Sequence, residues 1–267
     1  MPVPIPALIS YRAVDAVEAC NLSEAVFRSK YRSRKPVVIR SIAPSSLWFD
    51  ISSMADTIQD PIVMVAHDNE NFIDNDDYVA KIPLCDTTCA DISQLHPKQR
   101  LYLRSKVPDV VRKSLDIKHL MGMANISKVK DDLMRLWFSS PGCITPLHYD
   151  RCHGTLLQLV GTKRFVIFDG EETRQLYPCD GINGPTHASH ARHIGKNIDT
   201  NPAALLHDWP KMKDAEPWVV DLQPGDLLYT PPGFWHEVTS TSVSLSITIP
   251  WDMDSQEQQH IPPHMAF

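Results

Sequence analysis

The chain has 267 residues, of which 43% are hydrophobic and 22% are charged. This composition is that of a globular protein and excludes collagen-like, coiled-coil and disordered chains. The formal net charge of −6 disfavours broad, sequence-independent binding to nucleic-acid backbones. No apolar stretch approaches the ~20 residues that span a bilayer, and no secretory signal pattern opens the sequence. We therefore expect an intracellular protein of the nucleus or the cytoplasm, without a membrane partner.

Proline, glycine and cysteine usage narrows the fold class. The 22 prolines and ten glycines indicate many rigid turns between short elements, which favours β structure over a helical bundle. Six cysteines are too sparse for a disulfide scaffold in a chain of this length. Cys85 and Cys89 have the spacing of half a zinc site, but no second pair matches them, so we interpret both as loop residues.

The first hundred residues alternate between helix and strand patterns. Apolar residues at helical spacing predict a helix over residues 15–32, and residues 48–58 predict a second short helix. Runs of β-branched residues predict strands over 35–40 and 61–66. The polar segment 67–99 lacks the pattern of an acidic metal-binding loop, so we interpret it as a solvated excursion.

From residue 100 onward, short strand patterns follow one another closely. They cover residues 101–103, 133–138, 155–160, 164–168, 218–222, 226–229 and 243–249. This rhythm predicts an antiparallel barrel or jelly roll of about eight strands. We expect an N-terminal helix and strand segment (1–99), a barrel (100–252) with an inserted loop at about 179–217, and a C-terminal tail (253–267). The loop carries His187, His190 and His193, which we interpret as solvated or locally hydrogen-bonded.

His148 and Asp150 form the most informative pair in the sequence. They lie two residues apart beside a predicted strand, and residues i and i+2 of an extended chain project from the same face. His236 follows the strand pattern at 226–229 in a proline-braced loop, and in a jelly roll this segment can face the first pair across the barrel. Two histidines and one carboxylate on one side of a metal are the ligand set of non-haem Fe(II) oxygenases.

Two further residues suit the cosubstrate of such an enzyme. A dicarboxylate needs a cation for its distal end and a hydroxyl group that shares it. Lys163 starts the predicted strand at 164–168, and Thr145 lies three residues before His148. The alternative for Lys163 is a solvated turn lysine beside Gly161.

Several ordered motifs together resemble one family. They are Arg100–Leu103, Thr145–Asp150, Gly161–Arg164, Leu176–Pro178, Pro224–Asp226 and Trp235-His236. Through them the chain resembles the JmjC-type (cupin-like) Fe(II)- and 2-oxoglutarate-dependent oxygenases. Within that family it is similar to the small hydroxylases: the asparaginyl hydroxylase of the hypoxia-inducible factor, arginyl hydroxylases and the tRNA wybutosine hydroxylase.

The resemblance implies a mainly β fold, a double-stranded β-helix (jelly-roll or cupin) barrel with flanking helices on its N-terminal side. It implies that His148, Asp150 and His236 bind the catalytic iron. It also implies that Lys163 and Thr145 hold the distal carboxylate of 2-oxoglutarate and that Tyr102 adds a hydrogen bond.

One pocket position departs from the family pattern. Close relatives carry Asn six residues after the first metal ligand, whereas this chain has Gly154. The missing amide leaves the near carboxylate of 2-oxoglutarate less supported, unless Thr155 or a water replaces it. Alternatively, Gly154 is needed for its backbone, at a bulge or a close approach.

The implied activity couples decarboxylation of 2-oxoglutarate by dioxygen to hydroxylation of a C–H bond, and we expect a protein side chain as the first substrate class. A tRNA-base hydroxylase is the second interpretation, although the chain has only a short basic cluster at 28–35. A lysine or arginine demethylase is the third, and a non-catalytic cupin-fold binding protein is the fourth. The sequence indicates no oligomeric state.

Overall fold

The computed structural model describes residues 9–43, 62–67, 99–126, 129, 131–182, 184–261 and 263–265. Their strands are β1 (Arg12–Ala13), β2 (Asp15–Glu18), β3 (Val37–Arg40), β4 (Ile62–His67), β5 (Gln99–Lys106), β6 (Arg135–Ser139), β7 (Ile144–Tyr149), β8 (Gly154–Val160), β9 (Lys163–Phe168), β10 (Trp218–Leu222), β11 (Leu227–Thr230), β12 (Trp235–Ser240) and β13 (Ser244–Thr248). Their α-helices are α1 (Glu24–Val26), α4 (Asp109–Ser114), α5 (Ile117–Leu120), α6 (Ile194–Thr200), α7 (Pro202–Asp208) and α8 (Ser255–Gln258). The shorter or irregular helical turns are η1 (Ala19–Asn21), η2 (Phe27–Tyr31), η6 (Gly122–Ala124), η7 (Asp131–Leu133), η8 (Gly170–Gln175), η9 (Pro210–Asp214) and η10 (Pro263–Met265).

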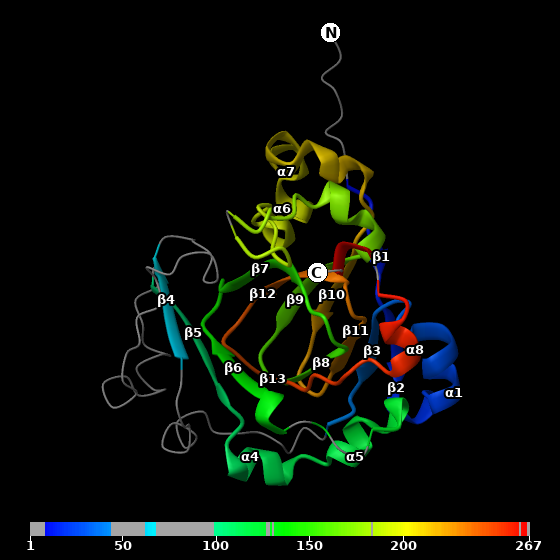
Figure 1. Ribbon diagram of the computed structural model, residues 1–267. Helices are drawn as coiled ribbons and strands as arrows, with labels where there is room; N and C mark the ends of the chain where they lie inside the picture. Colours follow the sequence, from blue (N-terminus) through cyan, green and yellow to red (C-terminus); the bar gives the residue numbers. More distant parts are fainter. Residues whose placement is uncertain are drawn as a thin grey trace.

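The strands form two sheets that face each other, and this confirms the predicted mainly β, jelly-roll class. The five-stranded sheet has the order β1-β10-β9-β12-β7, and the eight-stranded sheet has the order β2-β3-β11-β8-β13-β6-β5-β4. Figure 1 looks into the barrel that the two sheets enclose. Strands far apart in sequence, such as β7 and β12, are therefore direct neighbours.

Alternation along the strands separates the barrel interior from its outer faces. On β9, Phe165 and Ile167 belong to the apolar cluster between the sheets, whereas Val166 and Phe168 belong to the cluster beneath α6. Lys163 has the same parity as Phe165, and its side chain is buried in the interior. The strand pattern thus places a cation inside the barrel.

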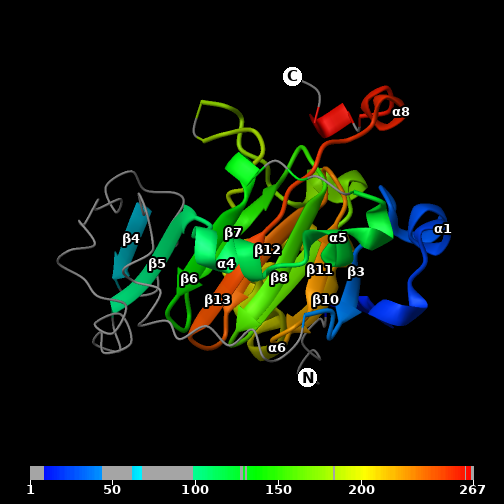
Figure 2. The ribbon, with the colours of Figure 1, turned by 90° about the horizontal axis from the view of Figure 1, so that it is seen from below.

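Helices cover the outer faces of both sheets. Ile194 and Ile198 of α6 and Leu205 of α7 pack on the five-stranded sheet, above the barrel in Figure 1. Helices α4 and α5 lie across the eight-stranded sheet, which Figure 2 shows from below. Val111 of α4 and Leu120 of α5 enter the same cluster as the outward side chains of β5, β6, β8 and β13. Burial of these apolar stripes holds short helices that would not persist alone.

The N-terminal prediction was correct only in part. Residues 15–18 form β2, which pairs in parallel with β3, so the predicted helix over 15–32 is wrong in its first part. The 3-10 turn η1 follows β2, and α-helical structure begins at Glu24 after Ser23, whose side chain accepts a hydrogen bond from the Val26 backbone N–H. Pairing with β3 outweighs the helical spacing of the apolar residues, because every residue of β2 has a register partner in β3. The strand predictions at 35–40 and 61–66 are confirmed as β3 and β4, while the predicted helix at 48–58 lies outside the described residues.

Two other segments differ from the prediction. The part of the 179–217 insertion predicted as loop contains α6 and α7, and Asn201 caps α7 by accepting from the Ala204 backbone N–H at 3.1 Å. The segment around His236, predicted as a loop, is the strand β12. Within the described part of the chain, no helix is long and apolar enough to cross a membrane.

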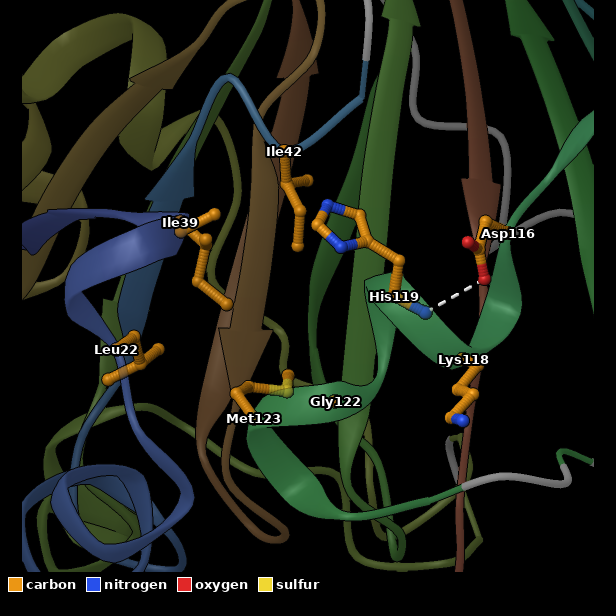
Figure 3. Close-up of a pocket in the computed structure, with 9 residues that line it drawn as sticks. Leu22, Ile39, Ile42, Asp116, Lys118, His119, Gly122 and Met123 are labelled. Carbon is orange, nitrogen blue, oxygen red and sulfur yellow. Dashed lines mark hydrogen bonds between the residues drawn. The ribbon is translucent and has the colours of Figure 1, made fainter.

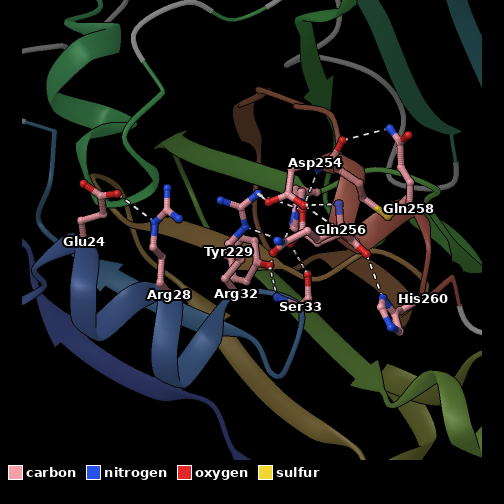
Figure 4. Close-up of polar contacts among 12 residues, drawn as sticks. Glu24, Arg28, Arg32, Ser33, Tyr229, Asp254, Gln256, Gln258 and His260 are labelled. Carbon is pink, nitrogen blue, oxygen red and sulfur yellow. Dashed lines mark hydrogen bonds and ion pairs between the residues drawn. The ribbon is translucent and has the colours of Figure 1, made fainter.

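A polar cluster, which we call the clasp, joins the start and the end of the chain (Figure 4). It consists of Arg32, Ser33, His153, Tyr229, Asp254 and Glu257. Arg32 donates to both carboxylate oxygens of Glu257 at 2.8 Å and to Asp254 at 2.9 Å. His153 Nε2 lies 3.1 Å from Glu257, and its Nδ1 lies 3.0 Å from the Tyr229 hydroxyl. The tail is thereby fixed to the barrel by charge-assisted hydrogen bonds.

Candidate active site

The two candidate metal-binding histidines lie side by side in one sheet. Strands β7 and β12 are antiparallel, and His236 is the register partner of His148. The expectation that the two segments face each other across the barrel is therefore wrong, because both belong to the same five-stranded sheet. Asp150 follows directly after β7, where its backbone carbonyl accepts from the Gly233 N–H at 2.9 Å. The hydrogen bonds of the sheet thus fix all three side chains together.

A register shift places Thr145 on the same side as His148. A regular strand would direct residues three apart to opposite faces. Between β12 and β7 the pairing moves from His236↔His148 to Val238↔Thr145, so β7 contains one extra residue. Such a bulge re-aims the side chains on either side of it, and Pro146, which lacks a backbone N–H, lies within it. Both Thr145 and His148 therefore line the same cavity.

The three ligand atoms of His148, Asp150 and His236 lie within 4.8 Å of one another. Among the described residues, this is the only group of three His, Cys, Asp or Glu side chains that converges in this way, and His187, His190 and His193 do not. The Nδ1 of His148 lies 2.8 Å from the Pro146 carbonyl, and that of His236 lies 3.1 Å from the Phe234 carbonyl. Each Nδ1–H donates to a backbone oxygen, so the lone pair of each Nε2 is available to bind a metal.

The electrostatics of this group suit a metal better than an internal ion pair. Burial, and then the neighbouring His148, lower the pKa of His236 to about 4, so its imidazole is neutral at physiological pH. His236 Nε2 lies 3.9 Å from the Asp150 carboxylate, too far for a hydrogen bond. Asp150 is exposed, with 53% of its side-chain surface accessible. Two imidazoles and one carboxylate with open positions fit Fe(II) or a similar divalent ion.

The group opens into a cavity of about 430 Å³ inside the barrel. Lys163 lies at its inner side, 1% exposed, and its ammonium donates to the Ser246 hydroxyl at 2.7 Å. Burial lowers the pKa of Lys163 to about 7. In the described part of the chain no carboxylate forms an ion pair with it. A buried ammonium without a counter-charge costs free energy, and a carboxylate ligand removes that cost, so the cavity fits the distal end of 2-oxoglutarate.

Tyr102 and Thr145 lie beside this ammonium. The Tyr102 hydroxyl and the Thr145 hydroxyl are 2.9 Å apart, and the Lys163 ammonium is 5.8 Å from the centre of the Tyr102 ring. Burial raises the pKa of Tyr102, which keeps its hydroxyl protonated as a donor. The structure therefore brings all six residues singled out in the sequence into one cavity.

Sequence reasoning missed the other polar residues of the cavity. Arg104, Arg135 and Trp137 line it. They lie on the inward faces of β5 and β6, where Arg104 pairs with Trp137. The sequence could have indicated Arg104, because it lies two residues after Tyr102 and so shares its face of the strand. Arg135 and Trp137 could not be placed beside it without the register between β5 and β6.

Gly154 lies at the start of β8 and lines the cavity. Its register partner is Thr230, and the pairing of β8 with β11 is regular. A Cβ built at this position would meet the Thr230 backbone oxygen at 3.7 Å, an ordinary van der Waals distance. The Thr155 hydroxyl donates to the Ile249 carbonyl on the outer side of the sheet, so it does not replace the missing amide. The position thus has room for a side chain.

Two other hollows differ in character from this cavity. One of about 390 Å³ lies between η1, β3 and the α5–η6 segment, with Leu22, Ile39 and Met123 as apolar walls (Figure 3). Its Asp116 caps α5 by accepting from the His119 backbone N–H. The other, of about 1480 Å³, is a groove along η8 and α8 that includes part of the clasp. The converging ligand set lies in neither hollow.

Comparison with known proteins finds relatives that match a little less than half of this chain at 31–34% identity. The chain is 32% identical over 119 residues to "Jumonji C domain-containing protein 5" of Drosophila melanogaster, covering 45% of this chain and 27% of that protein. It is 31% identical over 124 residues to "Lysine-specific demethylase JMJ30" of Arabidopsis thaliana, covering 46% and 27%. It is 34% identical over 125 residues to "HSPB1-associated protein 1" of Bos taurus, covering 45% and 24%. The matched regions therefore span about a quarter of the length of these relatives.

A solved structure gives a weaker likeness. YcfD of Escherichia coli aligns with a TM-score of 0.47 and 15% identity, covering 90% of this chain and 56% of that chain. The sequence resemblance to the JmjC-type, cupin-like proteins is confirmed by the family comparison. The model of the family "Cupin-like domain" matches residues 23–257, and the chain belongs to this family.

Proposed function

We propose that this protein is an Fe(II)- and 2-oxoglutarate-dependent oxygenase that hydroxylates a side chain of an intracellular protein. The observation that carries the proposal is the convergence of His148, Asp150 and His236 at the mouth of a cavity that also holds the buried Lys163. When bound, Fe(II) and 2-oxoglutarate supply the chemistry that inserts one oxygen atom of O₂ into a C–H bond, with release of succinate and carbon dioxide.

The residues of the chain have separate tasks in this activity. His148, Asp150 and His236 hold the metal, and the carbonyls of Pro146 and Phe234 keep both imidazoles in the tautomer that can bind it. Lys163 and the hydroxyls of Tyr102 and Thr145 bind the distal carboxylate of the cosubstrate. The two histidines, Lys163, Tyr102 and Thr145 lie on strands of a packed barrel, and Asp150 directly follows β7, so the site is organised before any ligand arrives.

Demethylation of lysine is the main alternative, because several relatives bear the name "Lysine-specific demethylase". The metal and cosubstrate requirements are the same in both reactions. Hydroxylation is favoured by the charge of the cavity, since Arg104 and Arg135 line it and repel a methylated lysine cation. Hydroxylation adds 16 Da to a substrate, whereas removal of a methyl group subtracts about 14 Da and releases formaldehyde.

The test measures metal binding and 2-oxoglutarate turnover in one set of variants. We expect about one equivalent of Fe(II), or of Mn(II) as an inert substitute, and succinate formation that requires Fe(II). His236→Ala is expected to lose metal binding with an unchanged circular dichroism spectrum. His207→Ala is the matched control, because the side chain of His207 is 88% exposed and lies outside the cavity. Unchanged metal stoichiometry in His236→Ala would contradict the proposal.

A further inference from the structure

The outer part of the cavity is a basic surface made by two paired strands. Arg104 on β5 is the register partner of Trp137 on β6, and Arg135 lies two residues before Trp137 on the same face. All three side chains line the cavity that contains the candidate metal site. We call Arg104, Arg135 and Trp137 the basic rim.

The basic rim has positive charge without matching negative charge. Among the described residues that line the cavity, Asp150 is the only carboxylate, and it belongs to the metal group. Burial, and then the charge of Arg135, lower the pKa of Arg104. Arg135 donates to the backbone carbonyls of Asp132 and Met134, which satisfies hydrogen bonds without neutralising the charge. Two partly buried guanidinium groups that repel each other are stabilised by an anion.

This charge is separate from the one that suits 2-oxoglutarate. Lys163 donates to Ser246 on β13, and Ser246 pairs with Trp137, which pairs with Arg104. The Arg104 backbone is thus two strands away from Ser246, or ~10 Å at the usual strand spacing. One dicarboxylate held at Lys163 and at the metal therefore leaves the basic rim available for another anionic group.

We propose that the basic rim selects a polypeptide that brings an aspartate or glutamate side chain into the cavity beside the residue to be oxidised. This inference rests on the proposed function, since it names the substrate class of the same site. Guanidinium groups recognise carboxylates through paired, planar hydrogen bonds, and a partly buried setting strengthens the contact. A lysine or arginine side chain of a substrate meets repulsion at the same place.

A polypeptide suits the basic rim better than a nucleic acid does. Single-stranded nucleic acids bind through bases that stack on open aromatic faces. The Trp137 ring is stacked with Tyr102 at 5.3 Å between centroids and 28° between planes, and its Nε1–H donates to Thr248 at 3.1 Å. The Arg104 guanidinium also lies 5.8 Å from the Trp137 ring. The net charge of −6 adds no general attraction for phosphate backbones.

The experiment compares two matched pools of fluorescein-labelled peptides. One pool has a central Glu or Asp in random flanks, and the other has Gln or Asn at the same position. Binding to the Mn(II)- and 2-oxoglutarate-loaded protein is measured by fluorescence anisotropy, beside a labelled single-stranded RNA 12-mer. We expect roughly tenfold tighter binding of the acidic pool, as one charge-assisted contact provides. Arg104→Gln is expected to abolish the preference, and Arg104→Glu is expected to reverse it in favour of the Gln or Asn pool.

Lys106→Gln is the matched control, because Lys106 is an exposed cation on the same strand outside the cavity lining. This variant is expected to keep the acidic preference. Equal binding of the two pools by the wild-type protein would overturn the inference, as would RNA binding that exceeds peptide binding and requires Arg104. Binding of 2-oxoglutarate to the same Mn(II)-loaded samples is measured first by calorimetry. Loss of that binding contradicts the proposed function, whereas its retention without an acidic preference contradicts only the inference.

Discussion

Two cations of this protein, Lys163 in the barrel and Arg32 after η2, have little exposure to solvent but opposite surroundings. Arg32 of the clasp reaches the carboxylates of Asp254 and Glu257, and its side chain is 13% exposed. Lys163 of the cavity is 1% exposed and has the Ser246 hydroxyl as its hydrogen-bond acceptor. Burial of a charge is costly unless it is paired. The clasp offsets that cost within the folded chain, whereas the cavity leaves it to be offset by a ligand. The difference separates a structural ion pair from a binding site.

The largest effect is expected at Lys163. Lys163→Met removes the cation and leaves a dicarboxylate unpaired in the cavity, which lowers the affinity for 2-oxoglutarate by roughly 2–5 kcal/mol. The free energy of unfolding is not expected to fall, because the variant replaces a buried, uncompensated charge by an apolar chain of similar length. Calorimetry with Mn(II)-loaded protein measures the first quantity and urea unfolding the second. Lys196→Met on α6 is the control, and an unchanged affinity in Lys163→Met would show that another group anchors the cosubstrate.

The reverse pattern is expected at the clasp. Glu257→Gln removes the carboxylate that accepts hydrogen bonds from Arg32 and from His153. The mostly buried Arg32 guanidinium then lacks one of its negatively charged partners. The expected loss is roughly 3 kcal/mol of unfolding free energy, the lower end of the range for a broken buried pair. Affinity for 2-oxoglutarate is expected to stay within twofold. Glu216→Gln, at a surface pair with Arg12, serves as the control. A stable variant with weakened cosubstrate binding would reverse the assignment of the two cations.

The clasp and the cavity also predict different pH dependences, of stability at the clasp and of 2-oxoglutarate affinity at the cavity. Hydrogen bonds from Arg32 and Ser33 outweigh burial and hold the pKa of Glu257 below its usual range. Its contribution to stability is therefore present above the unfolded pKa of ~4.5 and is lost as the pH falls. The pKa of Lys163 is lowered to about 7 by burial, so 2-oxoglutarate binding requires proton uptake above that pH. Affinity for 2-oxoglutarate is expected to decline from pH 7 to pH 9, while acid unfolding is shallower in Glu257→Gln. An affinity that rises with pH would contradict the role of Lys163.

The sequence allowed prediction of the barrel and of the candidate ligands because both depend on local alternation. Lys163, Phe165 and Ile167 share one parity, and His148 and Asp150 are two residues apart. The pairing of His148 with His236 could not be predicted in the same way. It depends on β12 being a strand of the same sheet as β7, and on a bulge that brings Thr145 to the side of His148. Both features come from tertiary pairing that overrides local propensity.

The basic rim was missed for a related reason. Arg104 and Trp137 are 33 positions apart in the chain and become neighbours only through the β5–β6 register. The helical spacing that begins at residue 15 misled the prediction as well, because the parallel pairing of residues 15–18 with β3 outweighs the local pattern. A pattern within one strand was informative, whereas contacts between strands required the structure.

The smallest effect is expected at Gly154, where the cavity departs from the family pattern. Backbone strain does not require glycine there, and a Cβ has its first contact at 3.7 Å. Gly154→Asn is therefore expected to fold normally and to tighten 2-oxoglutarate binding by ~1.5 kcal/mol, the lower end of the range for one hydrogen bond to a charged group, with unchanged metal affinity. Gly154→Ala adds a methyl group without an amide and is expected to leave the affinity unchanged. Calorimetry on both variants separates the two causes. Weaker binding in both would show that the cosubstrate or the substrate occupies the open space at Gly154. In that case the glycine serves to leave this space free, where an asparagine would supply an amide contact.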